Sequence, residues 1–207
     1  MQNSMTNALK ANVLLFTVMA VPCIFEAPFL LDLWLGSIPP HLVLFLRIIL
    51  ITSVVAPLSG TCCSAIHATG HIKSLSYITG TLYLCIPVIS WIAFSLGADA
   101  WWMFVIYGIV LCFITLVDVI LVKVNIPDFR IRHFIKKALI IYLVAFSGAI
   151  PVALVYVNFQ ESFLRFILTS LTYITNVALF TWVFLMNSDE RRKIADELKT
   201  KTKGLMR

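Results

Sequence analysis

Hydrophobic residues gather in six long runs, which short polar connections separate. The runs cover residues 11–31, 41–68, 77–96, 101–121, 138–156 and 163–186. An α-helix rises about 1.5 Å per residue, so roughly 20 apolar residues cross the hydrocarbon core of a bilayer. The pattern therefore predicts an all-α membrane protein, a six-transmembrane-helix bundle that forms a single domain over residues 1–207. The polar residues 187–207 are expected to form a tail outside the bundle.

Basic residues fall in alternate connections between these runs. Lys10, Lys73, five residues within 123–137 and seven within the tail account for 14 of the 16 Lys and Arg. The intervening connections have none; they are residues 32–40, 97–100 and 157–162. Lys and Arg are retained on the cytoplasmic side of a membrane. We therefore expect both termini and the tail to be cytoplasmic.

Composition supports a chain dissolved in lipid. Hydrophobic residues make up 60% of the chain, charged residues 13%, and the mean hydropathy is +0.96. The net charge of +6 follows from the inside-facing connections and their attraction to anionic membrane lipids. No nucleic-acid partner is expected. The five cysteines all lie within apolar runs, which is typical of small buried hydrophobic residues rather than a disulfide framework.

One pattern could mimic a metal site. Cys63, His67 and His71 are spaced at i, i+4 and i+8, which places three possible ligands on one helix face. Gly70 is expected to end the helix before His71, so we predict no metal. The chain also lacks a glycine-rich phosphate loop and a Ser/His/acid arrangement in supporting context. No cofactor is predicted, and an enzyme is not favoured.

Among the charged residues inside the apolar runs, three stand out: Glu26, Arg47 and Asp118. Such groups are costly in hydrocarbon and usually face protein or a wet cavity. We interpret Arg47 and Glu26 as candidate substrate-binding residues, with Arg47 as the cation that receives an anionic group. The alternative for Arg47 is an anchor that reaches the outer interface. Asp118 is a membrane-buried charge of unknown role, or an inner-interface residue close to Lys123.

The depths of Glu26 and Arg47 suggest that they form a pair. Glu26 lies ten residues before Gly36 and Arg47 eleven after it. In a helical hairpin that turns at Gly36, the two residues therefore reach nearly equal depth. Pairing lowers the cost of burying two opposite charges, so we expect contact between them. The alternative is that each side chain extends separately to the outer interface.

Two further stretches have a pattern of their own. Residues 59–65 are small and predict close packing of that half-helix against protein. In the connection 122–137, Ile131, Phe134 and Ile135 fall on one side of a helical wheel. This pattern predicts a short helix in the inner interface that Asp128 caps.

Four stretches, in order, carry a family resemblance. They are a proline-containing helix ending in Leu33-Trp34-Leu35-Gly36, a helix closing on Ala-Ile-His-Ala-Thr-Gly-His-Ile-Lys at 65–73, the turn Leu-Gly-Ala-Asp-Ala at 96–100, and Asn-Ser-Asp-Glu-Arg at 187–191. The chain resembles the C-terminal half of polysaccharide flippases. These are the lipid-linked oligosaccharide, or O-antigen, translocases of the multidrug/oligosaccharidyl-lipid/polysaccharide exporter superfamily.

The resemblance implies a location and a function. It implies a multi-pass protein of the bacterial inner (plasma) membrane, in which two bundles surround a central cavity. The pair translocates undecaprenyl-diphosphate-linked oligosaccharide for polysaccharide, including lipopolysaccharide, biosynthesis. This chain is then the C-terminal bundle, and its partner is a missing N-terminal bundle or a second protomer.

Three alternatives to transport remain open at this point. The chain could be a non-transporting scaffold subunit of a glycan-assembly complex. It could be a membrane-embedded transferase, or a truncated fragment without function.

Overall fold

The computed structural model describes residues 2–70 and 72–186, and these residues form helices and no strand. The elements in chain order are α1 (Gln2–Phe25), α2 (Ala27–Leu35), α3 (Leu42–Ser53), α4 (Ala56–Ala68), α5 (Ile72–Ser95), α6 (Trp102–Asn125), α7 (Ile131–Ser147), α8 (Ala149–Asn158), α9 (Phe163–Phe180) and the π-helix η1 (Thr181–Leu185). The all-α class is confirmed. The predicted tail, residues 187–207, lies outside the described residues.

Five helical stretches are long and apolar enough to cross a membrane. They are α1, α5, α6, residues 131–158 and residues 163–185. Helices α3 and α4 make a sixth if they are taken as one span bent by 40°. The described chain is therefore compatible with a multi-pass membrane protein.

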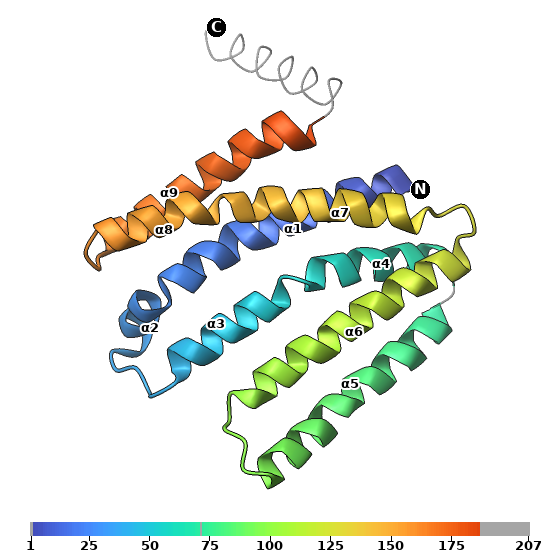
Figure 1. Cartoon of the computed structure of the whole chain (residues 1–207), viewed down its shortest axis with the longest axis horizontal. Coiled ribbons are helices and arrows are strands. Elements are labelled where there is room, and N and C mark those ends of the chain that lie inside the picture. Colours follow the sequence, from blue (N-terminus) through green and yellow to red (C-terminus); the bar gives the residue numbers. More distant parts are fainter. Residues whose placement is uncertain (1, 71, 187–207) are drawn as a thin grey trace, which may run out of the picture.

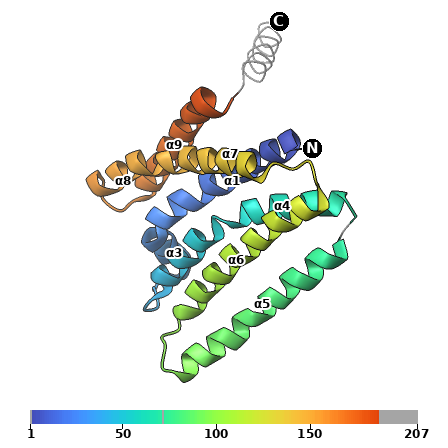
Figure 2. The same ribbon diagram turned by 45° about the vertical axis from the view of Figure 1, so that its right-hand side comes forward.

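The helices form a row rather than a closed ring (Figures 1 and 2). The row runs from α5 through α6, the α3–α4 pair and α1 to the α7–α8 pair and α9 (Figure 1). The connections α2–α3, α5–α6 and α8–α9 lie at the same end of the helices, on the left of Figure 1. The N-terminus and the connections α4–α5 and α6–α7 lie at the other. The connections without Lys or Arg thus lie together at one end of the helices, the non-basic end, and the basic ones lie together at the opposite, basic end.

The largest buried cluster lies where α1, α4, α6 and α7 meet. Its most enclosed side chains include Leu9, Val13, Ile66, Val122 and Phe134. A smaller cluster joins α1 to α8 and α9, and a third joins α5 to α6. Helix α5 buries one face against α6 and exposes the rest. Large exposed apolar side chains along the row provide the surface that hydrocarbon requires.

Several helix limits differ from the apolar runs. The run 41–68 is divided between α3 and α4, with Pro57 in the first turn of α4. Proline has no N–H and crowds the preceding turn, so it favours a break at this point. The first helix begins at Gln2 rather than at residue 11. Its polar first turns lie at the basic end, where a bilayer surface would be wet.

The short interfacial helix predicted within the connection 122–137 is instead the beginning of α7. Phe134 is fully buried against the main cluster, while Ile135 is half exposed. The amphipathic pattern therefore arises because α7 packs against the bundle. The cap position is Arg130 without a side-chain hydrogen bond, so the predicted Asp128 cap is wrong.

Candidate functional site

Glu26 sits between α1 and α2 with its side chain fully buried, and its partner is Arg165 in the first turn of α9. Arg165 Nε donates to Glu26 Oε1 at 2.9 Å, and Nη2 donates to Oε2 at 2.8 Å. Arg165 Nη1 donates to the Phe159 carbonyl at 3.2 Å, and the guanidinium stacks 4.6 Å from the Tyr156 ring centre. Two-point contact of this kind is strong and orients both groups. The predicted Glu26–Arg47 pair is wrong.

Sequence reasoning missed Arg165, although a signal for it existed. Arg47 and Arg165 are the two basic residues of the chain that lie outside the basic connections. Equal depth within one helical hairpin relates Glu26 only to the next helix along the chain. The actual partner lies 139 residues away in sequence, and the packing of α9 against α1 brings it close.

Arg47 has a different role at the same break. Its Nε donates to the Ile24 carbonyl at 3.0 Å. In an unbroken helix the N–H of residue 28 would bond this carbonyl, but residue 28 is proline and has no N–H. Arg47 therefore satisfies an acceptor that Pro28 leaves open. The side chain is half-buried, and its Nη groups make no hydrogen bond within the described residues.

Asp118 is fully buried on α6 against α4. The Ser59 hydroxyl donates to Asp118 Oδ2 at 2.5 Å, and Cys63 Sγ lies 3.6 Å from the same oxygen. Asp118 Oδ1 has no hydrogen-bond partner within the described residues. Tyr83 of α5 lies within electrostatic range of Asp118. Asp118 is thus an interior group with hydroxyl and thiol neighbours, not an exposed interfacial one.

Small and polar residues are exposed on the neighbouring helices α1 and α4. The Asn12 amide of α1 donates to the Thr61 hydroxyl of α4 at 3.4 Å, which joins the two helices edge to edge. Around this contact, the exposed residues are Ser4, Ala8, Ala11 and Asn12 on α1 and Gly60, Ser64, His67 and Ala68 on α4. We call this surface the α1–α4 face. The small-residue stretch 59–65 thus packs against protein only in part, since Gly60 and Ser64 face outward.

An apolar groove adjoins this face between α1 and the α3–α4 break. It is lined by Asn12, Leu15, Phe16, Met19, Ala20, Cys23, Leu50, Ala56 and Pro57. Asn12 is its polar end. At its other end Cys23 adjoins Ile24, whose carbonyl Arg47 holds. Arg47 does not line the groove, but its bond to the Ile24 carbonyl places it near the Cys23 end.

The remaining candidates give no further site. Cys63 and His67 lie on α4, while His71 falls outside the described residues. Among the residues that the structure describes, no three His, Cys, Asp or Glu side chains are grouped so that they could hold a metal ion.

Comparisons with known proteins identify no relative: no protein-family model, curated protein or solved structure matches the chain. The family resemblance of the four short stretches therefore has no independent support.

Proposed function

We propose that the chain is one bundle of a bacterial inner-membrane flippase for lipid-linked oligosaccharides and that it acts with a second bundle. The α1–α4 face is the observation that carries this proposal. It sets amide, hydroxyl and imidazole groups among small side chains on α1, which is long and apolar enough to span a membrane, and on α4, which is so only together with α3 as one bent pair. Polar and small residues at such positions suit a neighbouring helix or a wet cavity better than lipid tails.

The groove beside the α1–α4 face matches the chemistry of the proposed substrate. A polyprenyl-diphosphate-linked sugar has an apolar tail, an anionic diphosphate and a polar sugar. The apolar lining, which includes Leu15, Met19 and Leu50, suits the tail. Arg47 supplies a cation close to the groove, and its Nη groups make no hydrogen bond within the described residues. The sugar would lie along the polar part of the α1–α4 face.

The broken helices support a transport mechanism by rocking of one bundle against another. Transporters place irregular backbone where it lines a cavity, and their two halves move around that point. Here the groove is lined from both sides of the α3–α4 break, and its lining on α1 ends at Cys23, shortly before the α1–α2 break. Glu26 takes no direct part in this proposal, because Arg165 already neutralises it.

The first experiment asks whether the α1–α4 face is wet. In a variant without the native cysteines, Ser64→Cys is treated with a membrane-impermeant maleimide in membranes opened to give access from both sides. Leu116→Cys on α6 is the matched control, because Leu116 is exposed to 61% on an apolar helix face. We expect Ser64→Cys to react at least ten-fold faster. Equal, slow reaction at both positions would contradict a cavity and favour a dry scaffold interface.

The second experiment measures transport. The purified chain is reconstituted in vesicles with a fluorescent polyprenyl-diphosphate sugar, and its movement between leaflets is followed. One bundle cannot enclose a two-sided cavity, so the chain alone should not exceed protein-free vesicles. Transport by the monomer would overturn the two-bundle architecture. Transport by a homodimer would identify the second bundle as another copy.

A further inference from the structure

Two carboxyl groups are fully buried in the part of the chain that the structure describes, those of Glu26 and Asp118. Both oxygens of Glu26 accept hydrogen bonds from the Arg165 guanidinium. Asp118 accepts only from the Ser59 hydroxyl, at 2.5 Å, and from the Cys63 thiol, a weak donor at 3.6 Å, both through Oδ2. Its Oδ1 is buried and has no hydrogen-bond partner within the described residues. Similar burial is therefore combined with a cation in one case and with neutral groups in the other.

The titratable groups that face Asp118 carry no positive charge. They are Cys62 and Cys63 of α4 and Tyr83 of α5. Thiols and phenols are neutral near pH 7. His67, one turn after Cys63 on α4, is exposed, and no hydrogen bond or ion pair joins it to Asp118 within the described residues.

The cations of the helices that pack beside Asp118 make other contacts. On α6 itself, the Lys123 ammonium group donates to the Pro127 carbonyl. On α3, Arg47 Nε donates to the Ile24 carbonyl. On α5, Lys73 lies in the first turn and is exposed. These three helices therefore supply no counterion to the buried carboxyl group.

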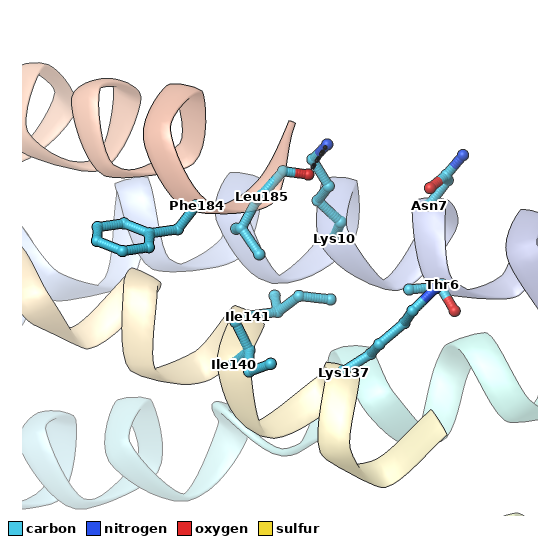
Figure 3. A pocket seen from close by; sticks show the side chains of 8 residues that line it. All are labelled: Thr6, Asn7, Lys10, Lys137, Ile140, Ile141, Phe184 and Leu185. Carbon is cyan, nitrogen blue, oxygen red and sulfur yellow. Dashed lines mark hydrogen bonds between the residues drawn. The ribbon is translucent and has the colours of Figure 1, made fainter. Parts of the chain in front are cut away.

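The cations of α1 and α7 lie in a separate groove at the basic end (Figure 3). Lys10 and Lys137 line this groove between α1, α7 and η1, and Lys10 Nζ donates to the Leu185 carbonyl at 3.0 Å. Asp118 is not part of the lining. Within the residues that the structure describes, no Lys, Arg or His side chain forms an ion pair with Asp118.

An ionised carboxylate in these surroundings would be unfavourable. A carboxylate leaves water at a high cost unless a cation or several donors take the place of the water. It has room for about four hydrogen bonds, and Asp118 has one strong donor and one weak donor. A bound proton removes the charge, and the group then needs no cation.

We propose that Asp118 is a proton-binding site inside the bundle. Helices α4 and α6 pack together while the carboxyl group is neutral. When water reaches the group between these helices, the carboxyl O–H bond breaks, the proton passes to water and a carboxylate remains. The site depends neither on the proposed substrate nor on transport.

The position of Asp118 indicates from which side the proton is exchanged. Asp118 lies seven residues before the end of α6 at Asn125, about 10 Å along the helix axis. This end of α6 is the basic end (Figure 1). Separation of α4 from α6 at the basic end would therefore expose the carboxyl group to water on that side of the membrane.

Infrared spectroscopy of the purified full chain tests the protonation state. A neutral carboxylic acid has a carbonyl stretch above the amide band that a carboxylate lacks, and a detergent without carbonyl groups leaves this region clear. At about pH 7, where exposed Asp and Glu are ionised, we expect this acid band in the parent, its loss in Asp118→Asn and its retention in Glu26→Gln. Ser59→Ala should shift the band without removing it. An acid band that is absent from the parent, or that persists in Asp118→Asn, would overturn the proposal.

The pH dependence of stability gives a second readout. An unfolded Asp loses its proton above about pH 4, so folding takes up one proton if Asp118 is neutral in the bundle. Between about pH 6 and 8, the unfolding equilibrium constant of the parent relative to that of Asp118→Asn should rise about ten-fold per pH unit. This ratio cancels the titration of the other groups. A ratio that is constant or falls with rising pH would show that folded Asp118 is ionised.

Sodium ion is the competing ligand, because a carboxylate beside a hydroxyl offers oxygen ligands to a hard cation. Replacement of choline chloride by sodium chloride at constant ionic strength should leave the acid band of the parent unchanged. If sodium removes the band, the site binds a metal cation and the assignment to a proton is wrong.

Discussion

Individual polar groups inside the spans form hydrogen bonds with side chains of other helices. Arg165 reaches Glu26 from α9, and Arg47 reaches the Ile24 carbonyl from α3. The sequence identifies Glu26 and Arg47 as costly groups, because charge in an apolar run is visible directly. It cannot identify their partners, because pairing depends on which helices pack side by side. Arg165 lies so close to the end of its run that its burial is also not visible in the pattern.

The Glu26–Arg165 pair should stabilise the bundle strongly. Arg165→Met leaves a buried carboxylate without its cation, which costs about 3–5 kcal/mol. Arg47→Met removes one hydrogen bond from a half-buried group and should cost about 1.5–3 kcal/mol. Unfolding of the purified variants in denaturing detergent measures both.

A double variant separates pairing from a general effect of position 165. Glu26→Gln with Arg165→Met removes both charges, so it should recover at least half of the loss seen in Arg165→Met alone. A double variant as unstable as the single one would show that the carboxylate is not the cause.

Several helices are broken, and at each of three breaks a side chain from another span donates a hydrogen bond to a backbone carbonyl. The Tyr142 hydroxyl of α7 donates to the Val54 carbonyl at the α3–α4 break, at 3.0 Å. The Tyr173 hydroxyl of α9 donates to the Ala145 carbonyl in the last turn of α7, at 2.9 Å. Together with Arg47 at Ile24, these contacts satisfy carbonyls at or next to a break, which hydrocarbon cannot do. The apolar runs predicted where the spans lie, but not that these breaks would be supported from outside.

Tyr142→Phe tests the support of the α3–α4 break. It removes only the hydroxyl and leaves the Val54 carbonyl without this donor, so stability should fall by about 1–3 kcal/mol. Tyr77→Phe is the control, because Tyr77 is exposed to 80%; it should stay within about 0.5 kcal/mol of the parent. Thermal unfolding in the same detergent compares the two, and equal stability would show that water replaces the lost hydroxyl.

Close approach of α3 and α6 depends on Gly108. A Cβ atom at this position would lie 2.3 Å from Thr52 Cγ2, whereas one at Gly80 on α5 would meet nothing within 4 Å. Gly108→Ala should therefore destabilise the bundle by about 1–3 kcal/mol. Gly80→Ala should be neutral or stabilise by up to about 1 kcal/mol. A Gly108→Ala variant as stable as Gly80→Ala would show that α3 and α6 can separate without loss.

The whole molecule is a row of helices, and the two ends of these helices differ in charge. Charge alternation along the sequence predicted this separation, because consecutive spans run in opposite directions and bring alternate connections together. The order of the helices across the row was not predictable, since most spans are apolar on all sides. The α1–α4 face was visible only in part: the small residues of 59–65 stand out in the sequence, but their division into a packed and an exposed side depends on where α1 and α6 lie.

Membrane topology is the prediction that tests this arrangement as a whole. Ser37 is part of the α2–α3 connection and Asp99 is part of the α5–α6 connection, and both connections lie at the non-basic end (Figure 1). Lys136 lies in the second turn of α7, which follows the α6–α7 connection at the basic end. In a cysteine-free background, Ser37→Cys and Asp99→Cys should label from outside the cell. Lys136→Cys should label only after permeabilisation. The bent α3–α4 pair could instead be a re-entrant loop, which would put Ser37 and Asp99 on opposite sides. That labelling pattern would contradict six spans, since connections at the same end of the helices cannot lie on both sides of a membrane.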